Sequence, residues 1–225
     1  MSLVQQGAPR RRALLLIATG GALLATFGVV ACQSQPEPSF GGPSVTALAP
    51  SSEPPAPAGP SVPVRKGELP AAAAAEKEPA KLTIPELDLT ATVSAVGIDQ
   101  KTGDFAVPPS VDRVGWYRYG PGFTADAGSI VIAGHVDSAE QGKGAFFKLG
   151  SLSSGDRISL ADEGGKTREF KVVARERYAK TKIPLDKYFA RDGDLRLTLI
   201  TCGGPFDAAT GHYRDNVVVT AKPVD

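Results

Sequence analysis

The chain has 225 residues, enough for one domain of ordinary size with additional tails, and its formal net charge is only +1. Basic and acidic side chains are nearly balanced, at 25 and 24, and no basic stripe is interleaved with aromatic residues, which argues against nucleic acid as a partner. The 25 glycines and 19 prolines are above average, so part of the chain is not expected to pack into a core.

The N-terminal region has the pattern of a membrane segment. Residues 1–12 end in three arginines, and the run from residue 13 to residue 31 is uncharged. At about 1.5 Å per residue this run spans roughly 28 Å as a helix, close to the bilayer hydrocarbon thickness. The core of a cleaved secretory signal is shorter, at about 7–15 residues. We therefore expect residues 1–12 in the cytoplasm, residues 13–31 as a single-pass signal-anchor in the cell membrane, and the remainder on the extracellular face.

Two other fates of this segment stay open. Val29-Val30-Ala31-Cys32 resembles the lipobox of bacterial lipoproteins, in which the cysteine is lipidated and becomes the new N-terminus. Ordinary cleavage is the third possibility. All three place the bulk of the chain outside the cytoplasm.

Residues 32–80 differ sharply in composition from what precedes them. Proline recurs together with Ser, Gly and Ala, as in the stretch of residues 52–64. Such a stretch buries too little apolar surface to offset its chain entropy. We therefore predict a disordered Pro/Ala/Ser-rich linker over residues 32–80.

Residues 81–225 are predicted to form one all-β domain. Short runs of β-branched residues alternate with turn residues, which is typical of a sandwich or a barrel. The predicted strands are Lys81–Ile84, Thr90–Val96, Ser129–Ala133, Arg157–Leu160, Glu169–Arg175, Leu195–Thr201 and Asn216–Ala221. Helical signal is weak, and short helices are expected only over residues 144–149 and 185–189. Many short strands in a domain of this length favour a closed or nearly closed barrel.

Three residues with complementary chemistry lie at the ends of predicted strands. Cys202 follows one strand, His135 follows another, and Arg214 precedes a third. A rigid barrel can present such residues in one cleft. An imidazole can favour the thiolate of a nucleophilic cysteine and protonate an amine leaving group, and a guanidinium can stabilise an oxyanion. Together they support acyl transfer through a thioester.

Each of these residues also has a simpler explanation. A lone cysteine is often a small buried hydrophobic residue. A lone histidine is often structural, and Arg214 could pair with Asp215. His212 competes with His135 for the role of the catalytic histidine, and Asp137 could orient His135. The order of histidine before cysteine argues against papain-like enzymes.

A family resemblance favours the catalytic interpretation. It rests on Ala133-Gly-His-Val-Asp137, on Thr198-Leu-Ile-Thr-Cys202, and on an arginine, Arg214, at the next strand. Further matching segments are Lys81–Pro85, Val114–Tyr117, Gly144–Phe147 and Leu152–Asp156. Residues 81–225 thus resemble the sortase family, and the ending Thr201–Asp207 with Tyr213–Asn216 is most similar to class F sortases of high-GC Gram-positive bacteria.

The resemblance implies an eight-stranded sortase-type β-barrel with short helices and a cysteine transpeptidase of the thiol-protease class. Cys202 would form a thioester with an LPXTG-like C-terminal sorting signal, His135 would act as general acid and then base, and Arg214 would steady the oxyanion. The expected partners are proteins with sorting signals and an amine of a peptidoglycan precursor or a protein. No cofactor or metal is expected.

Two other functions stay open at this point. An L,D-transpeptidase also uses a cysteine and a histidine, although its His-Gly and Gly-Cys segments are not reproduced here. A non-catalytic surface barrel that binds peptide or wall polymer would leave Cys202 inert.

Overall fold

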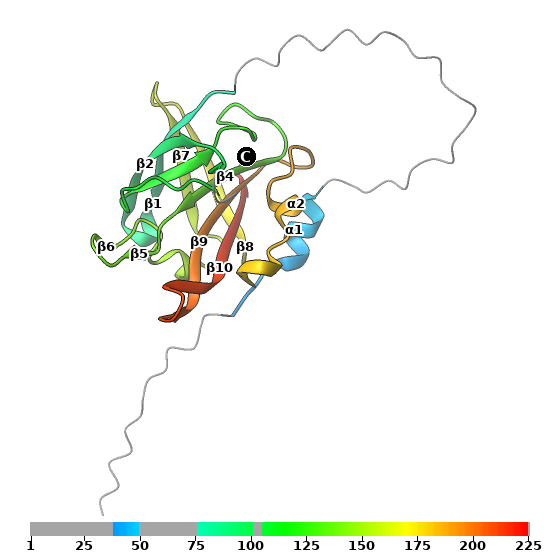
Figure 1. The fold of residues 1–225 in the computed structure, drawn as a ribbon. Helices are drawn as coiled ribbons and strands as arrows, with labels where there is room; N and C mark the ends of the chain where they lie inside the picture. Colours follow the sequence, from blue (N-terminus) through cyan, green and yellow to red (C-terminus); the bar gives the residue numbers. More distant parts are fainter. Residues whose placement is uncertain (1–37, 50–75, 101–104, 225) are drawn as a thin grey trace, which may run out of the picture. The chain divides into compact units, whose positions relative to one another are not determined.

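The structure, a computed structural model, describes residues 38–49, 76–100 and 105–224. Within these ranges eight strands close a barrel in the order β1-β2-β3-β4-β9-β10-β8-β7 (Figure 1). Its strands are β1 (Pro79–Ile84), β2 (Leu89–Val96), β3 (Arg113–Tyr117), β4 (Ser129–Gly134), β7 (Arg157–Asp162), β8 (Thr167–Ala179), β9 (Arg196–Asp207) and β10 (His212–Pro223). The prediction of an all-β, eight-stranded barrel is confirmed, and closure leaves the barrel no open edge.

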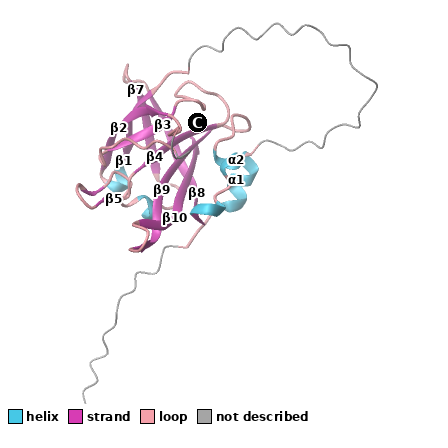
Figure 2. Ribbon diagram, in the orientation of Figure 1, coloured by secondary structure: helices cyan, strands magenta, loops and turns pink. Residues whose placement is uncertain are grey.

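Most neighbouring strands of the barrel are antiparallel, but β2 with β3 and β4 with β9 are parallel. Outside the barrel, β5 (Asp137–Ser138) pairs with β6 (Gly142–Lys143) in a two-stranded sheet. Helices are short (Figure 2). They are α1 (Gly42–Leu48), α2 (Leu185–Tyr188), η1 (Pro85–Leu87), η2 (Leu149–Ser151) and η3 (Lys180–Lys182).

Strand alternation decides which side chains fill the barrel. Along β9, Leu197 and Leu199 are fully buried in the main hydrophobic cluster, with Trp116 of β3 and Phe146 among their partners. Successive residues of a strand point to opposite faces, so the even-numbered residues of β9 lie on the outside of the barrel. The end of β9 can therefore present a side chain on the outer surface.

Some of the strands and helices predicted from the sequence were wrong. No strand was predicted at β3, where Gly115 interrupts the run of strand-forming residues, yet β3 pairs with both β2 and β4. Residues 144–148 form no helix, and a 3-10 helix begins only at Leu149. Helix α2 lies within the predicted range 185–189.

Residues 38–49 also differ from the expectation of a disordered linker over residues 32–80. They form a strap, our name for residues 38–49, that packs on the outer face of β8 and β10. Phe40 pairs with Arg175 of β8 through two backbone hydrogen bonds of 2.8 and 3.0 Å. Val45 of α1 is fully buried against Ala174 and Val218. The composition did not predict that residues 38–49 pack on the barrel. One aromatic ring and one buried valine are too few to change the overall composition of a long Pro-rich stretch.

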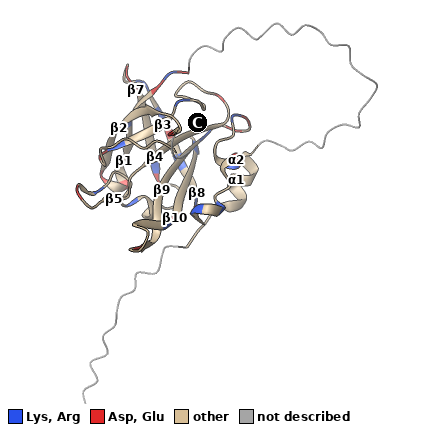
Figure 3. Ribbon diagram, in the orientation of Figure 1, with Lys and Arg blue, Asp and Glu red and all other residues tan. Residues whose placement is uncertain are grey.

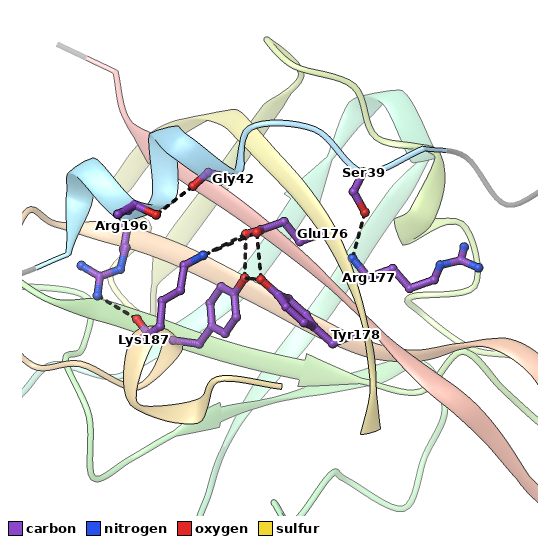
Figure 4. Close-up of polar contacts among 9 residues, drawn as sticks. Ser39, Gly42, Glu176, Arg177, Tyr178, Lys187 and Arg196 are labelled. Carbon is purple, nitrogen blue, oxygen red and sulfur yellow. Dashed lines mark hydrogen bonds and ion pairs between the residues drawn. The ribbon is translucent and has the colours of Figure 1, made fainter. Parts of the chain in front are cut away.

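Two buried arginines hold the strap at its ends. Arg175 donates a hydrogen bond of 2.9 Å to the carbonyl oxygen of Pro38. Arg196, at the start of β9, donates one of 3.1 Å to the carbonyl oxygen of Leu48 and another of 3.1 Å to that of Lys187 in α2. The same guanidinium therefore ties the strap, α2 and β9 together, and its bond to Lys187 is drawn in Figure 4.

Gly41 allows the strap to approach β8 closely. Its φ is +77°, and a Cβ atom there would come within 2.2 Å of the carbonyl oxygen of Val173. Any other residue would collide with the β8 backbone and adopt an unfavourable backbone conformation. Glycine at this position is therefore required for the strap to dock as it does.

Basic and acidic side chains are interspersed over the described strands and loops (Figure 3). In the part of the chain that the structure describes, no helix is long and apolar enough to cross a membrane. The predicted signal-anchor at residues 13–31 lies outside the described residues.

Candidate active site

His135 directly follows β4, whereas Cys202 lies inside β9, because this strand continues to Asp207 and does not end at Thr201 as predicted. Ala133 of β4 lies beside Ile200 of β9, and the hydroxyl of Thr201 donates a buried 2.9 Å hydrogen bond to the carbonyl oxygen of Gly134. The next residue on each chain is His135 and Cys202. Neighbouring strands lie about 4.8 Å apart, so continuing this register beyond Ala133 and Ile200 would bring His135 and Cys202 to adjacent positions along the two chains.

The thiol lies on the outer face of the barrel. Cys202 is opposite Asn216 of β10, and Asn216 is in turn opposite Tyr178 of β8. Cys202 is half-buried and free, and it is not sealed in the core. A half-buried free thiol can be reached by a substrate, as a nucleophile requires.

Backbone contacts define the orientation of His135. Its Nε2 lies 2.9 Å from the carbonyl oxygen of Pro108, which is buried in the loop between β2 and β3. A carbonyl oxygen can only accept, so Nε2 must carry the proton. In the neutral ring the lone pair is then on Nδ1, which remains available for Cys202 or for a substrate. The sequence analysis missed Pro108, because a backbone carbonyl leaves no signal in side-chain chemistry.

The loop behind His135 packs closely against it. The amide of Phe146 donates a 3.0 Å hydrogen bond to the carbonyl oxygen of His135, and that of Gly144 donates one of 2.9 Å to the carbonyl oxygen of Val136. A Cβ atom on Gly144 would come within 2.3 Å of the carbonyl oxygen of His135. The histidine backbone is therefore held from both sides.

Arg214 lies on the hairpin that carries Cys202. It is at an irregularity of β10 between Tyr213 and Asp215, two residues from the partner of Cys202. Its side chain is 65% exposed, and its Nη2 lies 3.1 Å from Oδ2 of Asp207 across the hairpin. Backbone hydrogen bonding from Ala209, followed by the Arg214 guanidinium, holds the pKa of Asp207 below its usual value.

His212 begins β10 and is exposed, opposite Asp207 near the tip of the hairpin. The register that brings His135 to Cys202 does not bring His212 there. The choice of His135 as the catalytic histidine stays a prediction.

A further pair beside the thiol was not predicted from the sequence. Tyr213 Oη donates a 2.5 Å hydrogen bond to Oδ2 of Asp137. This bond raises the pKa of Tyr213 to about 12, with smaller contributions from burial and from charge on Asp137 and Cys202. Asp137 was considered as a group that might orient His135, and the structure shows it bound to Tyr213 instead.

The outer face leading to the thiol is apolar. Ala133 of β4 is buried there, and Ile200 of β9 packs in the outer cluster with Phe189. The ring of Phe189 stands edge-on to that of Tyr117 at 5.2 Å between centroids, and Phe105 packs 6.1 Å from Phe189. Three half-buried rings thus lie together on the outer face near Ile200 of β9.

A buried polar cluster supports α2, which borders this surface. Oε2 of Glu176 accepts a 2.7 Å hydrogen bond from Tyr188 and lies 3.4 Å from Nζ of Lys187, while Tyr178 donates to Oε1 at 2.8 Å (Figure 4). Burial raises the pKa of Tyr188, and the Glu176 carboxylate adds to the effect. Both phenols stay protonated and hold α2 to β8.

The larger described cavity, of about 350 Å³, does not include the thiol. It is lined by residues 87–90 of η1 and β2, by Asp112, and by residues 143–145, 147 and 148. The last group belongs to the segment whose Phe146 amide donates a hydrogen bond to the carbonyl oxygen of His135. Among the described residues, no three His, Cys, Asp or Glu side chains are grouped so that they could hold a metal ion.

Comparison with known proteins identifies the family and agrees with the fold. The sortase domain family model matches residues 82–224. The lid mutant of sortase A from Corynebacterium diphtheriae is similar in structure, with a TM-score of 0.50 and 22% identity over 68% of this chain and 73% of that one. Sortase C1 from Streptococcus agalactiae is similar with a TM-score of 0.50 and 19% identity over 67% of this chain and 68% of that one.

The similarity to these two structures, at 22% and 19% sequence identity, supports the fold alone. No curated protein sequence matches the chain significantly. The family model covers well over half of the chain, including every residue of the candidate site. The chain belongs to the sortase family, whose members are cysteine transpeptidases.

Proposed function

We propose that the protein cleaves an LPXTG-like C-terminal sorting signal through a thioester on Cys202 and transfers the new C-terminus to an amine. The observation that supports the proposal is the buried hydrogen bond from Thr201 to Gly134, because these two residues directly precede Cys202 and His135 on the chain. A free thiol is only a few per cent ionised at neutral pH, so it needs a neighbouring imidazole.

In the acylation step the Cys202 thiolate attacks the carbonyl carbon of the scissile peptide bond. The carbonyl oxygen becomes an oxyanion, which Arg214 stabilises with N–H donors that Asp207 does not use. Protonated His135 gives its proton to the leaving amine as the C–N bond breaks. The product is a thioester, and neutral His135 remains.

In the second step an acceptor amine attacks the thioester. His135 takes a proton from the attacking nitrogen, the C–S bond breaks, and Cys202 leaves as a thiolate. An amide bond has replaced the original one, and the thiolate–imidazolium pair is restored. The oxyanion forms in both steps at the same carbonyl, so Arg214 serves both.

The apolar outer face is the proposed binding surface for the sorting signal. The Leu and Pro residues of an LPXTG-like motif would pack on Phe105, Tyr117 and Phe189, and the peptide would continue toward Cys202. Aromatic surfaces of this kind bind short apolar segments at low entropic cost. The acceptor is proposed to be an amine of a peptidoglycan precursor or of another protein.

We also propose that the domain acts on the extracellular face of the cell membrane and is anchored by residues 13–31. Because residues 38–49 pack on the barrel, residues 32–37 alone connect this segment to the folded unit along the chain. Fractionation and protease accessibility of cells expressing the full chain test the location. Recovery in the membrane fraction after Cys32→Ala distinguishes an uncleaved anchor from a lipid anchor.

The catalytic proposal is tested with the full chain and a fluorogenic LPXTG-type peptide, with and without an added amine. Cys202→Ala should abolish both cleavage and transfer. Arg214→Lys should lower kcat/KM by about 10²–10³, because an ammonium cannot reproduce the planar guanidinium. Arg191→Lys, an exposed change in another loop, is the matched control. Full activity in Cys202→Ala would overturn the mechanism and leave a non-catalytic peptide-binding barrel as the alternative.

A further inference from the structure

The bond between Tyr213 and Asp137 joins the two segments that carry the candidate catalytic groups. Tyr213 precedes Arg214 on β10, in the hairpin that also holds Cys202. Asp137 follows His135 by two residues and begins β5. The two residues are far apart in sequence, and the bond between them is 2.5 Å long.

Each partner is itself held by its own segment. The ring of Tyr213 packs edge-on to that of Phe206 at 5.2 Å between centroids, across the β9–β10 hairpin. Asp137 pairs with Lys143 in the β5–β6 sheet, and the adjoining Gly144 packs on the backbone of His135. The hydrogen bond therefore connects two locally ordered segments, and is not a contact between two loose side chains.

The Tyr213 hydroxyl stays protonated and can donate its hydrogen bond to Asp137 at neutral pH. Hydrogen bonding to Asp137 raises the pKa of Tyr213 to about 12, so the hydroxyl keeps its proton at neutral pH. Charge on Cys202 adds a smaller contribution in the same direction. Tyr213 and Cys202 lie on the two strands of the same β9–β10 hairpin.

We propose that Tyr213 and Asp137 are a positioning pair, which holds the segment after His135 against the β9–β10 hairpin and so keeps the imidazole facing Cys202. The proposal rests on the acyl-transfer function proposed above. Neither residue exchanges a proton with the substrate. Small displacements of reacting groups, of about 1 Å, can cost roughly 100-fold in rate, so such a bond acts on turnover more than on binding.

The first test is kinetic, with the full chain and the peptide assay. Tyr213→Phe should lower kcat about tenfold and change KM by less than about twofold. Asp137→Asn keeps an oxygen acceptor and should lose less than Asp137→Ala. The double variant Tyr213→Phe/Asp137→Ala should be no slower than the slower single variant, because both remove one bond. Thr124→Val, which removes a hydroxyl–carboxylate bond to Glu76 away from the candidate site, should leave kcat within about twofold.

The second test does not depend on turnover. The chain has only two histidines, so the ring resonances of His135 can be assigned in NMR spectra with a His212→Asn variant. Tyr213→Phe and Asp137→Ala should both shift or broaden the His135 signals, while Thr124→Val should not.

The outcomes separate the two proposals. If the unaltered protein transfers no peptide, the proposed function fails, and the His135 signals alone decide on the positioning pair. Unchanged His135 signals in Tyr213→Phe overturn the positioning role. Multiplicative losses of kcat in the double variant also overturn it, because they would show that the two residues act independently.

Discussion

Thr201 and Gly134 are joined by a 2.9 Å hydrogen bond, each one residue before a candidate catalytic residue. The bond is buried and links the side chain of one strand to the backbone of its parallel neighbour. Parallel strands set no register through a turn, because the chain between them is long. This bond therefore helps to fix which residue of β9 lies beside His135.

Replacing Thr201 tests that role. Thr201→Val keeps the shape but leaves the buried carbonyl of Gly134 without this donor, and should cost about 1–3 kcal/mol of stability. It should also lower kcat through the Cys202–His135 geometry. Thr201→Ser retains the hydroxyl and should keep most of both. Urea unfolding and the peptide transfer assay measure the two effects, and equal behaviour of the two variants would contradict the role of the hydroxyl.

The two histidines should differ strongly in function. His135→Ala should reduce kcat by about 10²–10⁴, the usual contribution of a general acid–base group. His212→Ala changes an exposed residue at the start of β10 and should stay within about twofold. Activity lost in His212→Ala and kept in His135→Ala would reverse the assignment.

The strap should contribute to the stability of the catalytic domain. Val45→Asp places a charge among Ala174, Tyr188 and Val218 and should cost about 2–3 kcal/mol. The loss is limited because the strap can detach before the barrel unfolds. Ala47→Asp adds the same charge on the exposed side of α1 and is the matched control.

Denaturant unfolding and limited proteolysis within residues 38–49 measure the effect of detachment. Equal stability and equal protease resistance of the two variants would show that the docked strap contributes nothing.

Stability should fall in acid through Asp162. Its carboxylate is buried and lies 2.6 Å from Nζ of Lys77, and that hydrogen bond is the main cause that holds the pKa of Asp162 below its usual value. A carboxyl whose pKa is lower in the folded state stabilises the protein above its unfolded pKa, about 3.9, and loses this contribution as pH falls through the folded pKa. The stabilisation is therefore present at pH 7 and lost below about pH 4.

Melting temperatures between pH 7 and pH 3 check this prediction. Asp162→Asn should melt below the unaltered protein at pH 7, and the difference should shrink toward pH 3. Asp186→Asn, at an exposed position of α2, should show no such trend. A constant difference across this range would mean that the ion pair does not act through the titration of Asp162.

The sequence alone determined the class of fold and the kinds of reacting group. Alternating β-branched runs indicate strands of an all-β domain, because side chains on a strand face the core and the outside in turn. The eight-stranded barrel was an expectation from the family resemblance. The segments around His135, Cys202 and Arg214 indicate the family, because each residue stands in a recognisable local motif, although Cys202 and Arg214 lie inside β9 and β10 and not at the strand ends that were predicted. Strand β3 was missed because Gly115 weakens the local signal, and its pairing with β2 and β4 decides its conformation.

Only the tertiary structure decided what these groups touch. The carbonyl of Pro108 at His135, the carboxylate of Asp207 at Arg214 and the pairing of Tyr213 with Asp137 all join segments that local sequence leaves unconnected. The docking of residues 38–49 is of the same kind, because Val45 and Phe40 are buried only once β8 and β10 offer a surface. The amino-acid composition of a segment does not show such single contacts. They depend on which distant parts of the chain meet in the folded protein.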